Sequence, residues 1–348
     1  MKKINTVLCS FGMSGKVFHA PFITLHPGFN LLGAWERSKE VIREFYPGAK
    51  SYKSFEEILN DSNVDLVIIN TPNYTHYDYT KKALLAGKHV VVEKPFTTTV
   101  AEGEELKKLA AEKGKIISVY HNRRYDSDFK ILQQVLHDNL LGEVVEAEFH
   151  YDRFREEISA KAHKEVPGPG AGIVYDLGAH LIDQAIQLFG YPKAVFADIV
   201  IVRPLSKVDD YFELLFYYPH TRVRLKGSYM VREALPAYVI HGRKGSFIKS
   251  KADVQEEVLL AGGKPTDTPD WGLEPESEAG LLHTEIDGKI VKKKLPAPQG
   301  NYLGFYKDLY ELLENNKPGP TTADDGISVI KIIEAAFKSS NEKRAVEL

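Results

Sequence analysis

Short apolar runs alternate with amphipathic stretches over the first third of the chain. The runs are nearly continuous, as in strands buried on both faces, and they cover Ile4–Cys9, Asn30–Trp35, Val64–Asn70, His89–Val92 and Ile116–Tyr120. Residues between them have helical spacing over Lys39–Phe45, Phe55–Asn60, Thr75–Ala86 and Val100–Lys113. This alternation predicts an α/β fold with a doubly wound parallel sheet, that is, a Rossmann domain over residues 1–121.

The pattern changes after about residue 122. Helices are predicted near 126–139, 174–189, 304–314 and 325–339. Strands are predicted over 143–155, 195–202, 211–218, 221–230, 237–241 and 246–248. A stretch rich in Gly, Pro and acidic residues predicts a loop over 261–280. Residues 122–348 therefore form a predicted α+β domain with a large, mainly antiparallel open sheet.

Composition narrows the class of protein. The net charge of −3 provides no basic surface for nucleic acid, and we expect no nucleic-acid or membrane partner. The single cysteine, Cys9, cannot form an internal disulfide, which fits a reducing compartment. No signal-peptide pattern opens the chain, so a cytoplasmic location is expected.

A glycine-containing loop follows the first predicted strand. Its residues are Ser10, Phe11, Gly12, Met13, Ser14 and Gly15, which fit the dinucleotide fingerprint G-x-G-x-x-G with serine at the first glycine. The glycines allow close approach of a pyrophosphate, and a following helix would offer free N–H groups. Ser10 would add strain if its position required a positive φ.

The end of the second predicted strand gives conflicting signals about the cofactor. Glu36 lies where an acidic residue would hold the ribose 2′-OH of NAD. Arg37 and Ser38 would instead suit the 2′-phosphate of NADP, although Arg37 can also be a solvated loop charge. We favour NADP and keep NAD open.

Polar residues also follow the strand that ends at Asn70. These are Asn70, Thr71, Pro72, Asn73 and His76, which are candidates for contacts to the ribose and nicotinamide. Helix capping by Asn73 or Thr75 is the alternative, and the two roles are compatible.

The run His89–Val92 leads into Glu93, Lys94 and Pro95. Ligands bind at the carboxyl ends of parallel strands, so Lys94 is expected beside the reactive ring of a cofactor, with Glu93 next to it. The proline restricts the lysine backbone. Taken alone, Lys-Pro after a strand can also be an ordinary surface turn.

Asp176 and His180 are the second candidate pair. On a helix they are four residues apart and project from one face. A polar stripe beside an apolar one is typical of a solvent-facing surface, so this pair can also be structural. With Lys94 they form a set suited to hydride transfer, in which His180 moves a proton and Lys94 stabilises the oxygen. Metal-binding motifs are absent from the sequence, and no metal is expected.

Ser10-x-Gly12-x-x-Gly15, Glu93-Lys94-Pro95 and Asp176-x-x-x-His180 together resemble the Gfo/Idh/MocA family of nicotinamide-dependent oxidoreductases. Local strings such as Val92–Phe96 resemble a subgroup that contains NADP-dependent scyllo-inositol dehydrogenases. The resemblance implies a substrate domain whose open sheet forms a homodimer or homotetramer contact. It also implies that Asn122 and Arg123 lie near the substrate, although two arginines in a loop can be a plain surface patch.

The function that the resemblance implies is oxidation of a secondary alcohol of a cyclic polyol or sugar with NAD(P). The same residues could run a keto-sugar reductase in the opposite direction. A cofactor-sensing regulatory protein without catalysis is the alternative from another class.

Overall fold

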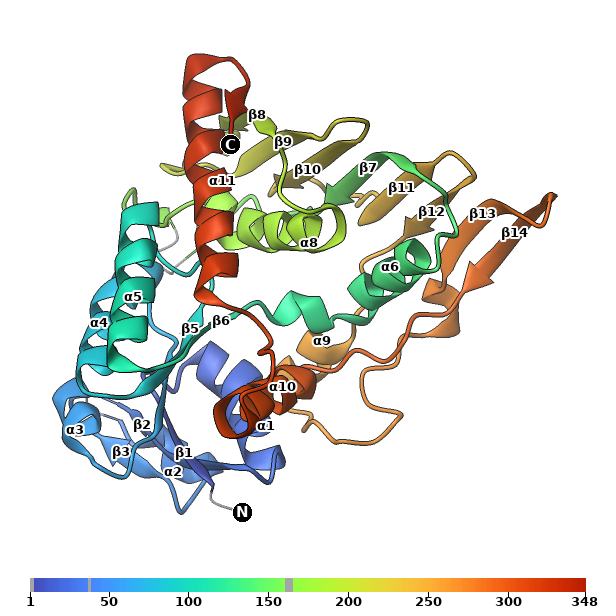
Figure 1. Ribbon diagram of the computed structural model, residues 1–348. Coiled ribbons are helices and arrows are strands. Elements are labelled where there is room, and N and C mark those ends of the chain that lie inside the picture. Colours follow the sequence, from blue (N-terminus) through green and yellow to red (C-terminus); the bar gives the residue numbers. More distant parts are fainter. Residues whose placement is uncertain (1–2, 37–38, 160–164) are drawn as a thin grey trace. The chain divides into compact units, whose positions relative to one another are not determined.

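The computed structural model describes residues 3–36, 39–159 and 165–348 (Figure 1). The chain forms two compact units. Unit 1 contains residues 1–122, 255–271 and 301–327, and unit 2 contains residues 123–254, 272–300 and 328–348. Each unit is built from segments that are far apart in the sequence.

Unit 1 is built on a parallel sheet. Its strands are β1 (Ile4–Leu8), β2 (Phe29–Trp35), β3 (Lys50–Tyr52), β4 (Leu66–Ile69), β5 (His89–Glu93) and β6 (Ile117–Tyr120). The strand order is β3-β2-β1-β4-β5-β6, so the order reverses between β1 and β4. The continuous apolar runs are buried on both faces, as Leu66–Ile69 shows. The predicted doubly wound sheet is confirmed.

Helices of unit 1 connect these strands, and the last two in the following list come from later segments of the chain. They are the π-helical turn η1 (Gly15–His19), α1 (Ala20–Leu25), α2 (Val41–Phe45), α3 (Phe55–Asn60), the 3₁₀ turn η2 (Asn73–Thr75), α4 (His76–Leu85), α5 (Val100–Lys113), α9 (Gln255–Leu260) and α10 (Leu303–Asn315). Figure 1 shows α4 beside α5 and α10 beside α1. Phe22 of α1 and Tyr306 of α10 stack with ring centroids 6.3 Å apart. A late segment of the chain thereby completes the first unit.

Unit 2 is built on a mainly antiparallel sheet, as predicted. Its strands are β7 (Val144–His150), β8 (Ala194–Val200), β9 (Tyr211–Tyr217), β10 (Arg222–Ser228), β11 (Tyr238–Gly242), β12 (Gly245–Lys249), β13 (Gly280–Ile286), β14 (Lys289–Leu295) and β15 (Val346–Glu347). The order is β14-β13-β12-β11-β7-β10-β9-β8-β15, and β7 and β10 pair in parallel. Alternate residues of β9 are buried, as expected for a sheet with one covered face.

Helices pack with this sheet and carry the candidate pair. They are α6 (Ser127–His137), the π-helical turn η4 (Val174–Gly178), α8 (Ala179–Phe189) and the short 3₁₀ turn η5 (Glu276–Glu278). The 3₁₀ turn η3 (Asn122–Tyr125) lies at the junction of the units, and α11 (Ala323–Glu342) begins in unit 1 and continues in unit 2. In the part of the chain that the structure describes, no helix is long and apolar enough to cross a membrane.

The structure corrects several predicted elements. Strands β3, β13, β14 and β15 were not predicted, because β3 and β15 are very short and β14 carries four lysines, a composition typical of edge strands. The predicted strand 143–155 ends at His150. The helix predicted over 174–189 begins with the wider turn η4 rather than with an α-helix.

A capping box begins α5 and gives a test of local stability. Thr99 Oγ1 accepts the Glu102 backbone N–H, and Glu102 Oε2 accepts the Thr99 backbone N–H at 3.1 Å. We expect Thr99→Ala to lower the free energy of unfolding by about 1 kcal/mol, because the Glu102 backbone N–H loses its side-chain acceptor. Urea denaturation measures this, with Lys108→Ala on the exposed face of α5 as the control. Equal stability of the two variants would contradict the capping assignment.

Candidate active site

The glycine loop is fastened by one amide side chain. Asn70 Oδ1 accepts the Ser10 backbone N–H at 2.9 Å, and Asn70 Nδ2 donates to the Ser10 carbonyl at 2.8 Å. The same Nδ2 lies 3.2 Å from Ser14 Oγ. Because β1 and β4 are neighbours where the strand order reverses, these bonds join the two strand ends at that point. Asn70 thus holds the loop on which dinucleotide binding was predicted.

Ser10 replaces the first glycine of the fingerprint without backbone strain. Its φ is not among the positive values recorded for non-glycine residues. Its Oγ accepts the Gly12 backbone N–H at 3.2 Å, which is a local turn contact typical of serine. The strain that Ser10 could have added is therefore not present.

The two glycines of the loop have different surroundings. A Cβ on Gly15 would lie 2.4 Å from the Ser10 carbonyl oxygen, so only glycine fits there. A Cβ on Gly12 would meet only Ser10 Oγ, at 3.3 Å. Gly15 is required by the fold of the loop, whereas Gly12 leaves an open backbone face.

The neighbouring loop side chains differ in exposure. Phe11 is buried and contacts the rings of Phe45 and Tyr46, with centroids 5.7 and 6.2 Å away. Met13 is 46% exposed. Phe11 therefore anchors the loop to the end of α2, and Met13 faces outward.

Glu36 is buried and caps a helix. Its Oε1 accepts the Val41 backbone N–H at 3.0 Å, and its Oε2 accepts the Ile42 backbone N–H at 3.2 Å. Both carboxylate oxygens are thus occupied at the N-terminus of α2, which is a favourable place for a negative charge. Arg37 and Ser38 lie outside the described residues.

The residues after β4 form a compact turn. The hydroxyls of Thr71 and Thr75 are 2.7 Å apart, and Thr75 Oγ1 also donates to the Pro72 carbonyl at 2.7 Å. Thr75 is the N-cap of α4 without a side-chain capping bond, and Asn73 opens η2. The hydroxyls thus stabilise the turn rather than cap α4.

His76 is fully buried. Its Nδ1 lies 2.8 Å from the Pro95 carbonyl oxygen and its Nε2 lies 2.9 Å from the Thr71 carbonyl oxygen. The imidazole thus joins the turn after β4 to the turn after β5. Both ring nitrogens lie against backbone carbonyl oxygens, so the His76 side chain stabilises these two turns.

Lys94 follows directly after β5, at the carboxyl end of the parallel sheet, and is half-buried. Its peptide bond to Pro95 is cis. Glu93, the last residue of β5, places Oε1 2.9 Å from Nε2 of His19. The turn that carries Lys94 is therefore connected to buried side chains on both of its flanks.

Asp176 and His180 lie together in unit 2. The Tyr229 hydroxyl is 3.5 Å from Asp176 Oδ2, and the ring of Tyr151 lies 6.3 Å from that of His180. Burial, followed by the charge of Asp176, raises the pKa of Tyr229, so its hydroxyl stays protonated and donates. Two tyrosines missed by the sequence analysis thus surround the predicted pair.

The first part of the polar side of α8 is buried, in contrast to the solvent-facing alternative, whereas Gln187 further along is exposed. His180, Asp183 and Gln184 are 6, 2 and 2% exposed. Arg124 donates to both carboxylate oxygens of Asp183, at 2.9 and 2.5 Å. Tyr238 donates to Gln184 Oε1 at 3.2 Å. This stripe is an internal polar layer of unit 2.

Gly172 fixes the start of this helical segment. Its φ is +95°, and a Cβ there would lie 2.0 Å from Asp209 Oδ1. Asp209 in turn accepts the Val174 backbone N–H at 3.0 Å. Only glycine permits the chain to enter η4 in this way.

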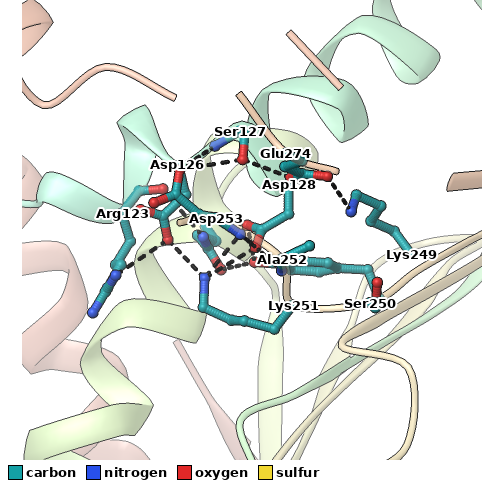
Figure 2. Close-up of polar contacts among 12 residues, drawn as sticks. Arg123, Asp126, Ser127, Asp128, Lys249, Ser250, Lys251, Ala252, Asp253 and Glu274 are labelled. Carbon is teal, nitrogen blue, oxygen red and sulfur yellow. Dashed lines mark hydrogen bonds and ion pairs between the residues drawn. The ribbon is translucent and has the colours of Figure 1, made fainter. Parts of the chain in front are cut away.

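Asn122 and Arg123 are buried and do not form a surface patch. Arg123 Nη1 lies 3.5 Å from Asp126 Oδ2. Asp126 Oδ2 also lies 2.7 Å from the ammonium nitrogen of Lys251, and Asp128 Oδ2 lies 3.2 Å from it. Figure 2 shows both carboxylates beside Lys251. The fully buried carboxylates of Asp126 and Asp128 therefore both form ion pairs.

The same network continues through the loop that follows β12 (Figure 2). Asp128 Oδ2 accepts the backbone N–H groups of Ala252 and Asp253, at 2.9 and 3.1 Å. Burial is the largest cause acting on Asp128 and opposes ionisation, yet Lys251 and these N–H groups lower its pKa overall. Buried ion pairs and hydrogen bonds therefore hold the turn η3 in place.

The candidates are divided between the units. Lys94 and the glycine loop belong to unit 1, whereas Arg123, Asp176 and His180 belong to unit 2. Among the side chains that the structure describes, no group of three or more His, Cys, Asp or Glu residues could hold a metal ion.

Comparisons with known proteins decide the family. An oxidoreductase family with an NAD-binding Rossmann fold matches residues 4–121, and the C-terminal alpha/beta domain of that family matches residues 133–348. The chain belongs to the Gfo/Idh/MocA family of oxidoreductases. The expected fold class and the expectation of an enzyme are thereby confirmed.

Relatives of this Gfo/Idh/MocA protein match over its full length. The scyllo-inositol 2-dehydrogenase (NADP(+)) IolW of Bacillus subtilis is 39% identical, covering 100% of this chain and 97% of that protein. The uncharacterized oxidoreductase YdgJ of Escherichia coli is 38% identical over 98% and 97% of the two chains. The crystal structure of an oxidoreductase from Bacillus cereus has a TM-score of 0.91 at 32% identity, covering 100% and 99% of the two chains.

The two glycines give a matched test of the Gfo/Idh/MocA glycine loop. Gly15→Ala should lower the melting temperature and cofactor affinity together, because its Cβ meets loop backbone. Gly12→Ala should weaken binding of the nicotinamide dinucleotide, measured with NADPH and NADH, by about tenfold or more with an unchanged melting temperature, because its Cβ occupies the open face. Calorimetric titration and thermal melting measure both effects. The assignment is wrong if Gly12→Ala binds NADPH like the parent protein.

Lys251→Met tests the buried network. We expect a loss of about 2 kcal/mol in the free energy of unfolding, because the buried carboxylates of Asp126 and Asp128 lose an ammonium partner that is itself 31% exposed. Because the pKa of Asp128 is lowered in the folded protein, its ionised carboxylate stabilises the fold at pH values above the ordinary pKa of an aspartate. This stabilisation is lost as the pH falls toward the lowered pKa. The deficit should therefore shrink on acidification.

Lys343→Met is the control for this experiment, because Lys343 pairs with Asp198 on the surface of unit 2. Denaturant unfolding at several pH values measures both variants. A Lys251→Met deficit no larger than that of the control, or one that grows on acidification, would contradict this account of the network.

Proposed function

We propose that this protein transfers a hydride between NADP(H) and a secondary alcohol of a cyclic polyol or sugar of the inositol type. The observation that carries the proposal is the position of Lys94, directly at the carboxyl end of β5 in a parallel sheet whose glycine loop follows β1. The full-length similarity to an NADP-dependent scyllo-inositol 2-dehydrogenase supports the substrate class.

The residues of unit 1 fit a dinucleotide. Gly12 presents an open backbone face to a pyrophosphate, and Gly15 lets the loop close against Ser10. The buried Glu36 already binds two backbone N–H groups, which leaves it less suited to a ribose 2′-OH. This supports NADP over NAD, with Arg37 and Ser38 as the proposed 2′-phosphate ligands. When bound, the nicotinamide supplies the hydride acceptor or donor.

Side chains of this protein would accept the hydroxyl proton of the substrate and stabilise the negative charge that develops on its oxygen. Lys94 would donate a hydrogen bond to the reacting oxygen and stabilise its developing negative charge. His180 would take the hydroxyl proton, because an imidazole titrates near neutral pH. Asp176, kept in place by Tyr229, would contact the substrate or support the charged histidine. The reverse direction, reduction of a keto-sugar, uses the same groups.

Lys94→Ala is the direct test of this proposal. We expect turnover to fall by a factor of about 100 or more, while the Kd for NADPH changes by about threefold or less, because the lysine acts on the reacting oxygen. Calorimetry with NADPH and NADH comes first, followed by steady-state kinetics with a panel of inositols and sugars. Lys108→Ala, a surface change on α5, is the control.

Two outcomes would contradict the proposal. Full activity of Lys94→Ala would remove the lysine from the chemistry. Binding of a nicotinamide cofactor to the parent protein, with no turnover of any polyol or sugar, would favour the cofactor-sensing regulatory protein instead.

A further inference from the structure

A buried histidine lies behind the Lys94 turn. His19 is the last residue of η1, directly after the glycine loop, and its side chain is fully buried. Its Nε2 is 2.9 Å from Glu93 Oε1, and Glu93 immediately precedes Lys94. This bond joins the helical turn of the glycine loop to the end of β5.

The proton positions in this contact follow from the partners. A carboxylate can only accept, so Nε2 of His19 carries the proton and donates to Glu93. Nδ1 of the neutral ring is then an acceptor, and it lies 2.7 Å from the Tyr306 hydroxyl. Burial raises the pKa of Tyr306, so this hydroxyl keeps its proton and donates. Tyr306, His19 and Glu93 therefore form one directed chain of hydrogen bonds.

Aromatic packing fixes the orientation of the imidazole. The Tyr120 ring lies 4.4 Å from it at an angle of 46°. Tyr120 is the residue of β6 that pairs with Glu93 of β5, and its hydroxyl donates to the Phe18 carbonyl at 2.8 Å. The ring of His19 thus has little freedom to turn away from Glu93.

The charge of Glu93 depends on this contact. Burial by itself raises the pKa of Glu93, but the hydrogen bond from His19, and then electrostatic interactions with His19, Lys94 and His76, lower it overall. Among the described residues, the titratable groups that interact with Glu93 include these three and Tyr306. Without the hydrogen bond from His19, the effect of burial, which raises the pKa of Glu93, would be less fully offset. Glu93 would then take up a proton at higher pH.

We propose that His19 is a positioning residue for Lys94, which keeps Glu93 as an oriented carboxylate and thereby fixes the turn at the end of β5. His19 is fully buried, so it acts through Glu93 and does not touch cofactor or substrate. This inference rests on the proposed function, because the activity it supports is that of Lys94.

A pair of amide variants tests the inference. The amide nitrogen of glutamine reaches the place of imidazole Nε2, whereas that of asparagine reaches only the place of Nδ1. His19→Gln should therefore keep kcat within about threefold of the parent, and His19→Asn should lower kcat about tenfold or more. The Kd for NADPH should change by about threefold or less in both. Of these two amide variants, only His19→Asn should move the acid limb of the kcat–pH profile to higher pH.

His26 provides the matched control. It lies at the end of α1, and its ring contacts Tyr310, one turn along α10 from Tyr306, at 5.1 Å. His26→Asn removes a histidine–tyrosine contact of the same segment but touches no residue of the Glu93 chain. Its kcat and pH profile should match those of the parent. Tyr306→Phe, which removes only the hydroxyl, should shift the acid limb in the same direction as His19→Asn.

The outcomes separate this inference from the proposed function. Equal kcat values and equal acid limbs for His19→Asn and His19→Gln would overturn the role of His19, while inactivity of Lys94→Ala would leave the proposed function in place. If His19→Asn does not fold, an unshifted acid limb in Tyr306→Phe overturns the inference. Full activity of Lys94→Ala would instead overturn the proposed function itself.

Discussion

The arrangement of unit 1 depends on the hydrogen bonds between Asn70 and the backbone of Ser10. These bonds cross the one place in the sheet where the strand order reverses, between β1 and β4. At this point the segments that follow β1 and β4 leave toward opposite faces of the sheet, so a ligand can reach the carboxyl ends of the two strands. By fastening the loop, Asn70 also sets the start of η1, and the far end of η1 carries His19. The position of Lys94 is thus connected to the glycine loop through side chains.

Both units support their candidate residues with buried polar groups from remote parts of the chain. In unit 1, Tyr306 of α10 and His19 reach Glu93, and His76 reaches Pro95. In unit 2, Lys251 and the loop after β12 hold the carboxylates beside η3. Such groups are costly to bury unless every partner is present, so each network favours a single geometry. A reaction that requires fixed distances benefits from this rigidity.

The sequence predicted what depends on local pattern. The parallel strands follow from continuous apolar runs, the glycine loop from the spacing of Gly12 and Gly15, and the position of Lys94 from a strand that ends before a proline. What it missed depends on distant pairing. His19 meets partners 74 and 287 residues away, and no local pattern marks such a contact. The burial of Asp183 was missed for the same reason, because its partner Arg124 is 59 residues away. Strand β14 was missed because four of its seven residues are lysines and none of its residues is fully buried.

The central claim is that the carboxyl edge of the parallel sheet binds NADP(H) with the nicotinamide beside Lys94. A crystal structure of the protein with NADPH measures this most directly. The account predicts the pyrophosphate against the backbone of Gly12 and the nicotinamide ring in van der Waals contact, at about 4 Å, with the Lys94 side chain. A nicotinamide ring bound away from Lys94, or a pyrophosphate that does not touch the glycine loop, would contradict it.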